Sequence, residues 1–157
     1  MNTNTVALAT VAIATEQEGY PGVPYPLEHA LVYYLKNRKV NFDFIFTWPY
    51  FYPKKELGEA PWLTQIAIDV IEYPHSFDLA KRLEDLSAMG ILATQRCSST
   101  SFFPGPIALK RRDEFIELFN KVGGVKYRKL RNLVRAGLEA PKDLLDQCYL
   151  FYINEVK

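Results

Sequence analysis

Imidazole and thiol groups, which act as bases, nucleophiles and metal ligands, are few in this chain: it has two histidines and two cysteines. His29 lies in an apolar, helix-like segment, whereas His75 lies in a turn-like segment, where it would support the turn or contact a partner. Cys97 and Cys148 stand at no metal-ligand spacing, and we interpret them as buried, reduced thiols. These residues predict neither a metal centre nor a catalytic base.

Sequence motifs that position a nucleophile or a phosphate group are absent. The chain contains no nucleophile-elbow turn, no phosphate-binding glycine loop, and no cluster of histidine, cysteine and carboxylate residues at ligand spacing. Because catalysis needs such groups to converge, we predict a non-enzymatic protein that uses no cofactor and no metal ion.

Basic residues are the second group of side chains that could serve a function, because they can bind phosphate groups. The formal net charge is only +1, so any contact with nucleic acid must come from a local patch. Between residues 110 and 135 nine basic residues face three acidic ones, which makes this segment the best candidate for binding phosphate groups. The alternative is a solvated helix face whose basic side chains cover apolar surface. The nine are Lys110, Arg111, Arg112, Lys121, Lys126, Arg128, Lys129, Arg131 and Arg135.

Aromatic residues are concentrated between positions 42 and 52. Such a run stacks on bases, forms a protein interface, or fills a core. Rings occur on both faces of an extended chain after Ile45, so we expect some of them to stay at the surface and to contact a protein. The residues concerned are Trp48, Tyr50, Phe51 and Tyr52.

Helical spacing of apolar residues predicts most of the elements that position these groups. Pro26 and Pro61 each open a helix, and Pro74 ends the second of them. Ser76 is a good N-cap for the next helix, which Gly90 ends. The predicted helices are 27–38, 62–73, 77–89, 112–122, 126–138 and 142–155.

Strands are predicted in three places. Residues 5–14 are uncharged and rich in valine and threonine, which favours a buried strand, although a helix would suit the same letters. Residues 42–47 alternate phenylalanine with other residues and predict a second strand, which ends before Pro49.

The third place is a hairpin. Two β-like runs, residues 91–97 and 102–110, flank the polar residues 98–101. Because Pro104 and Pro106 fall in the second run, we expect that strand to be irregular or to lie at a sheet edge.

Composition indicates a single globular domain. The chain has 157 residues, of which 48% are hydrophobic and 24% charged. Its apolar stretch from Val6 to Ala14 is too short to cross a membrane and lacks the basic residues that begin a signal peptide. We therefore expect a cytoplasmic protein without membrane contact.

The segment from Trp62 to Lys110 carries a family resemblance. It runs helix, tight turn, helix, glycine, hairpin, with Leu83, Leu86 and Gly90 in the spacing L-x-x-L-x-x-x-G. This order resembles the winged helix-turn-helix superfamily. The resemblance implies an α+β fold in one domain, 1–157, with a winged-helix core, an N-terminal strand and helix extension, and C-terminal helices. The core would span 26–122 and the C-terminal extension 123–157.

In this resemblance residues 77–89 occupy the position of the recognition helix. Lys81 and Arg82 would reach DNA there, and Arg96 at the hairpin would reach a neighbouring groove. The same helix carries Asp78, Glu84 and Asp85, and carboxylates beside phosphate groups oppose binding.

Winged-helix domains resemble one another whether they bind DNA or protein, so two functions follow from the resemblance. The first is a non-catalytic adaptor subunit of an SMC-like or ABC-type ATPase complex that handles nucleic acid, similar to the middle components of three-component defence systems. The second is an autonomous homodimeric DNA-binding regulator, with its dimer interface on the C-terminal helices. That interface would use Leu130, Leu133, Val134, Leu144, Leu145, Cys148, Tyr149 and Tyr152, which could equally pack inside one protomer.

Overall fold

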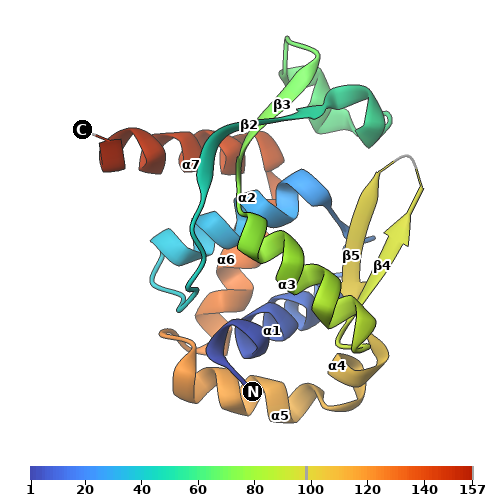
Figure 1. The fold of residues 1–157 in the computed structure, drawn as a ribbon, viewed down its shortest axis with the longest axis vertical. Coiled ribbons are helices and arrows are strands. Elements are labelled where there is room, and N and C mark those ends of the chain that lie inside the picture. Colours follow the sequence, from blue (N-terminus) through green and yellow to red (C-terminus); the bar gives the residue numbers. More distant parts are fainter. Residues whose placement is uncertain (98, 157) are drawn as a thin grey trace.

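The N-terminal segment is a helix. The computed structural model describes residues 1–97 and 99–156, and its first element is α1 (Thr3–Gln17) (Figure 1). The side chain of Asn2 caps this helix by accepting a hydrogen bond from the backbone N–H of Thr5, at 2.8 Å. The predicted strand at residues 5–14 is therefore wrong. Every residue from Thr5 to Thr15 is buried, so the helix is apolar on all sides and its sequence shows no helical period.

The second helix agrees with the sequence. β1 (Val23–Pro24) leads into α2 (Tyr25–Asn37), and Pro26 lies in the first turn as predicted. Helix α2 is buried from Pro26 to Leu35 because it packs against α6, α7 and β3.

An extended segment and a two-stranded sheet follow α2. Residues 42–46 carry no regular secondary structure, so the strand predicted at 42–47 is wrong except for its last residue, Thr47. The strand is β2 (Thr47–Pro53), which pairs antiparallel with β3 (Val70–His75). Proline is tolerated in β2 because a sheet of only two strands leaves the outer side of each strand unpaired.

The helix predicted at residues 62–73 is absent, so the closely joined helix pair from Trp62 onward, on which the winged helix-turn-helix resemblance rested, does not form. In its place lie two short 3₁₀ turns, η1 (Lys54–Leu57) and η2 (Pro61–Gln65), and then β3, which includes Pro74. The apolar residues Ile66, Val70 and Ile71 suit helix and strand alike, and pairing with β2 selects the strand.

The helix predicted at residues 77–89 and the hairpin after it are confirmed. Helix α3 (Phe77–Ala88) begins at Ser76, whose hydroxyl accepts a hydrogen bond from the backbone N–H of Leu79 at 3.1 Å. It ends at Gly90, whose φ of +75° suits glycine. β4 (Leu92–Arg96) and β5 (Thr100–Pro104) then pair antiparallel.

The second hairpin strand departs from the prediction. β5 lies between β1 and β4, so it is the central strand of this sheet and pairs regularly on both sides. Its run ends at Pro104, and Pro106 opens the short helix α4 (Pro106–Lys110). The expectation of an edge strand is wrong because the N-terminal residues that form β1 supply a third strand.

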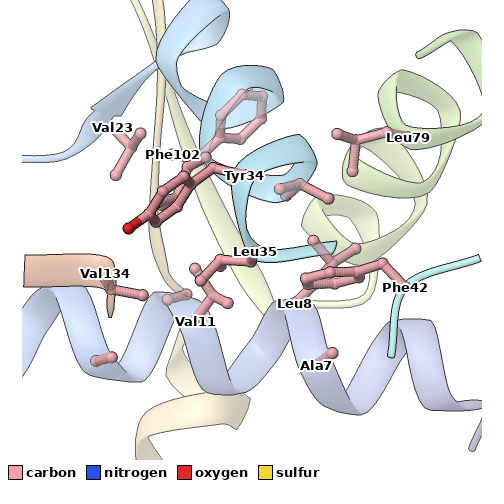
Figure 2. Close-up of a cluster of buried hydrophobic side chains, with 14 of the residues drawn as sticks. Ala7, Leu8, Val11, Val23, Tyr34, Leu35, Phe42, Leu79, Phe102 and Val134 are labelled. Atoms are coloured by element: carbon pink, nitrogen blue, oxygen red, sulfur yellow. The ribbon is translucent and has the colours of Figure 1, made fainter. Parts of the chain in front are cut away.

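Three C-terminal helices complete the chain, as predicted. They are α5 (Arg112–Val122), α6 (Tyr127–Glu139) and α7 (Pro141–Val156). Side chains from α1, α2, α3 and β5 meet in one core, in which Leu8, Leu35, Leu79 and Phe102 lie close together (Figure 2). The fold is thus α+β. None of the helices in the described part of the chain is long and apolar enough to span a membrane.

Most of the apolar residues that a C-terminal dimer interface would use are packed inside the protomer. Six of the eight are buried, and Tyr152 is half-buried. Only Tyr149 is exposed. The buried six are Leu130, Leu133, Val134, Leu144, Leu145 and Cys148.

Candidate partner-binding surface

The aromatic strand β2 lies at the surface, as its sequence predicts. Phe51 is 56% exposed and Tyr50 36% exposed, whereas Trp48 and Tyr52 are half-buried. Figure 1 shows β2 and β3 at one end of the molecule, and α4 and α5 at the opposite end. Strand β2 therefore presents rings to solvent on a two-stranded ribbon.

A register shift in β2 divides its aromatic residues between two sides. Thr47 pairs with His75 and Tyr50 with Tyr73, so β2 contains one residue more than β3 across this interval. Trp48, which lies in the shifted segment, packs on α7, with ring centroids 6.0 Å from Tyr149 and 5.6 Å from Tyr152.

Beneath Tyr50 lies a column of stacked rings that the sequence did not reveal. The ring of Tyr50 stacks on His75 at 4.3 Å, and His75 stacks on His29 at 4.4 Å with an interplanar angle of 11°. The hydroxyl of Tyr25 lies 2.9 Å from Nε2 of His75. His75 thus belongs to β3 and to the core, and the predicted turn role is wrong.

Both histidines are held in the neutral form. The backbone N–H of Ser76 donates a hydrogen bond to Nδ1 of His29 at 3.1 Å, so the proton of that ring resides on Nε2. Burial lowers the pKa of His29, as does the neighbouring His75, and burial lowers the pKa of His75 as well. The pair supports β2 from below. Within residues 1–97 and 99–156, no group of three side chains is placed to hold a metal ion.

The outer face of α3 is mixed in charge and partly apolar. Lys81 and Arg82 line a hollow of about 350 Å³ together with Asp43, Asp78 and Asp85. Three carboxylates around two cations oppose the approach of a phosphate group. At its two ends the same helix exposes Phe77, by 61%, and Met89, by 57%.

Ion pairs occupy much of the predicted phosphate patch. The sequence count included only acidic residues within the segment 110–135, whereas the fold brings further carboxylates to it from α1 and α6. The pairs are Arg111–Glu114, Arg112–Glu16 at 2.7 Å, Lys121–Glu117 at 3.8 Å, Arg131–Glu18 at 3.3 Å and Arg135–Glu139 at 3.8 Å.

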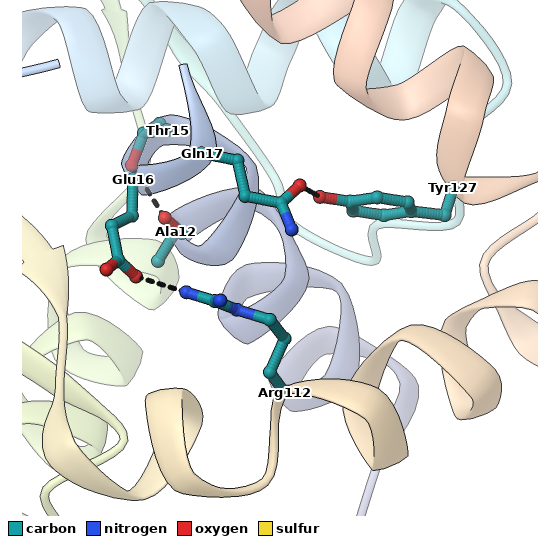
Figure 3. A network of polar contacts seen from close by, with 6 residues as sticks. All are labelled: Ala12, Thr15, Glu16, Gln17, Arg112 and Tyr127. Atoms are coloured by element: carbon teal, nitrogen blue, oxygen red, sulfur yellow. Dashed lines mark hydrogen bonds and ion pairs between the residues drawn. The ribbon is translucent and has the colours of Figure 1, made fainter. Parts of the chain in front are cut away.

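Two of these ion pairs, Arg112–Glu16 and Arg131–Glu18, and one further hydrogen bond attach the end of α1 to the helices around it. Arg112 binds Glu16 from the start of α5, and the hydroxyl of Tyr127 from α6 donates to the side chain of Gln17 (Figure 3). Arg112 and Arg131 therefore stabilise the fold locally. In the described chain, the basic residues of the patch without an ion pair are Lys110, Lys126, Arg128 and Lys129.

The remaining predicted residues lie apart from one another. Arg96 is exposed at the end of β4, and of the polar hairpin residues Ser98 lies outside the described residues. Cys97 is exposed, which contradicts its predicted burial, because it follows the last paired residue of β4. Cys148 is buried as predicted. Its thiol donates to the carbonyl of Ala30 at 3.3 Å, and burial raises its pKa.

Comparison with protein families, with curated protein sequences and with solved structures gives no match to this chain. The arguments about its function therefore rest on its own residues.

Proposed function

We propose that this chain is a non-catalytic adaptor subunit built on a winged-helix scaffold. It would connect an SMC-like or ABC-type ATPase, or an effector, to another subunit of a nucleic-acid-handling complex. Two helices, α1 and α2, precede α3, which continues through Gly90 into the hairpin β4–β5. The sheet order β1–β5–β4 places a short strand from before α2 beside that hairpin. This order supports the winged-helix scaffold.

The scaffold has an insertion where a helix-turn-helix has its turn. Residues 38–76 separate α2 from α3 and supply β2, β3 and the two 3₁₀ turns. The aromatic ribbon is thus an addition to the scaffold, placed between the two helices that a DNA-reading domain joins closely.

The observation that carries the proposal is the exposure of aromatic rings on this ribbon. Interfaces between proteins are enriched in aromatic residues, and their strongest contributors are rings that enter a partner's pocket. Phe51 is more than half exposed while its neighbours Tyr50 and Tyr52 are held in place by the histidine column and Tyr25. A rigid base with an exposed ring suits protein recognition.

An autonomous DNA-binding regulator is the second candidate, and one observation favours it. Lys110, Lys126, Arg128 and Lys129 carry no ion pair to the described residues, and Arg96 is exposed on the hairpin. The charges around α3 and the burial of the C-terminal apolar residues favour the adaptor instead.

Affinity capture from the native host, with and without nuclease, tests the proposal. The wild-type chain should recover a stoichiometric protein partner that survives nuclease treatment. Phe51→Ala should weaken capture by roughly tenfold or more, which corresponds to the loss of one strong interface contact. Met89→Ala is a matched control, because Met89, the C-cap residue that follows α3, is exposed to the same degree.

The two variants separate the candidate functions. Loss of the partner with Met89→Ala but not with Phe51→Ala would move the interface to α3 and contradict the proposal. Recovery of DNA fragments that share a sequence, without any protein, would replace the adaptor with the regulator.

A further inference from the structure

A hollow lies beside Trp48, between the end of α2, the segment before β2 and the end of α7. Its volume is about 380 Å³, which is at the lower end of the range for ligand pockets and suits a single side chain. It is lined by Tyr33, Lys36, Ile45, Phe46, Trp48, Tyr152, Glu155 and Val156.

Four aromatic rings form much of this lining. Trp48 and Tyr152 are stacked, with centroids 5.6 Å apart and an interplanar angle of 23°. Tyr33 and Phe46 meet edge to face at 5.1 Å. The faces of such rings attract cations, most strongly that of tryptophan.

Two buried polar groups belong to residues that line the hollow. The hydroxyl of Tyr33, whose residue is only 5% exposed, interacts with Glu155, and burial together with this carboxylate raises its pKa. The indole Nε1–H of Trp48 is buried without a hydrogen-bond partner among the described residues, so the packing of its ring on α7 holds the indole in place.

Among the described residues that line the hollow, one is acidic, Glu155, and one is basic, Lys36. Glu155 lies in the last turn of α7, where the helix end is itself partially negative, and no basic residue of the described chain lies in that turn. The ammonium of Lys36 is engaged, because it donates to the carbonyl of Phe44 at 2.5 Å and lies 5.8 Å from the ring centroid of Phe46. One face of the aromatic lining therefore already holds a cation.

We propose that this hollow binds a cationic side chain, arginine or lysine, from the partner protein. The cation would lie against the rings of Trp48 and Tyr152 and pair with the carboxylate of Glu155. The inference names the partner chemistry of the adaptor and rests on that function. Binding of the cationic group itself is measurable without the partner.

The experiment titrates the full chain with N-acetyl-arginine methylamide and follows the indole N–H of Trp48 by NMR, assigned with the Trp62→Phe variant. The citrulline analogue, which has the same shape without the charge, is the control ligand. The arginine ligand should shift the Trp48 signal to saturation, and the citrulline ligand should bind roughly tenfold more weakly, as expected for a lost charge pair with a ring contact.

Two substitutions that remove charges of opposite sign test the inference further. Glu155→Gln should weaken arginine binding and Lys36→Gln should strengthen it, because the first removes an attractive charge and the second a repulsive one. Glu117→Gln, the same exchange on α5, should change nothing. Stronger binding with Glu155→Gln and weaker binding with Lys36→Gln would indicate an anion site. The inference would also be overturned if the Trp48 signal did not shift, or if the citrulline analogue bound as tightly as the arginine ligand. If Phe51→Ala still abolishes partner capture in that case, the adaptor function stands without this pocket.

Discussion

Glu28 is an acidic side chain held out of water in the first turn of α2. Burial raises its pKa to about 7, because a buried carboxylate loses its hydration. In the unfolded chain this group ionises near the ordinary glutamate pKa of 4.5, so between pH 4.5 and 7 the folded state binds more protons. Its contribution to stability is complete below pH 4.5 and is lost as the pH rises towards 7.

The prediction is that Glu28→Gln stabilises the protein at pH 7.5 and has little effect at pH 4.5. The expected gain at pH 7.5 is about 3 kcal/mol, the free-energy equivalent of the pKa shift. Urea denaturation of both proteins at the two pH values measures it. An equal effect of the substitution at both pH values would show that Glu28 is ionised in the folded state.

His29 and His75 have the opposite pH dependence. Their pKa values are lowered on folding, so the unfolded chain binds more protons as the pH falls below 6.5, and the stability they contribute is lost there. In the Glu28→Gln protein the opposing contribution of Glu28 is removed, so the stability measured by urea denaturation should increase from pH 5 to pH 7. The column of stacked rings that contains His29 and His75 could not be predicted from the sequence, because the residues that meet in it are far apart in the chain. His29 and its hydrogen-bond partner Ser76, for example, are 47 positions apart.

At the scale of elements, local signals predicted helices well where one face was apolar and a cap was present. Helix α3, with Ser76 before it and Gly90 after it, is the example. Two of the failures were α1, which is buried all round, and β3, whose apolar residues fit both periods. In both cases tertiary packing decides between helix and strand, and the local sequence does not contain that information.

Ser76→Ala should destabilise the protein by about 1 kcal/mol, the usual cost of a lost N-cap hydrogen bond. The loss should be seen in thermal or urea denaturation. Ser99→Ala removes the same hydroxyl from the hairpin turn and should have a smaller effect. A Ser76→Ala protein as stable as the wild type would mean that water replaces the cap to Leu79.

At the scale of the whole molecule, the largest concentration of positive charge is partly neutralised, because five of the nine basic residues between positions 110 and 135 form ion pairs. Arg112 and Arg131 hold α1, which the sequence could not show because Glu16 and Glu18 are distant in the chain. The exposure of the aromatic residues, in contrast, was predicted, because rings on both faces of an extended chain cannot all be buried, although the strand that carries them, β2, was not. The candidate interface was therefore visible in the sequence, whereas its support by the histidine column and α7 was not.

Binding to duplex DNA of arbitrary sequence tests the charge distribution. We expect weak binding that salt abolishes, and the double variant Arg128→Gln, Lys129→Gln should reduce the salt dependence by about one unit of slope per lost phosphate contact. The double variant Lys81→Gln, Arg82→Gln should change little, since three aspartates surround these cations. A larger loss from the α3 variant would indicate that this helix reads DNA.

The segment between α2 and α3 leaves and rejoins the body of the protein at neighbouring points, because Thr47 is paired with His75. A segment closed at its base in this way tolerates changes in its outer part without altering the distance between the helices that flank it. The outer residues of the ribbon can therefore change without a change in the core that contains Leu8 and Phe102. Related chains would then differ in partner choice through these outer residues alone.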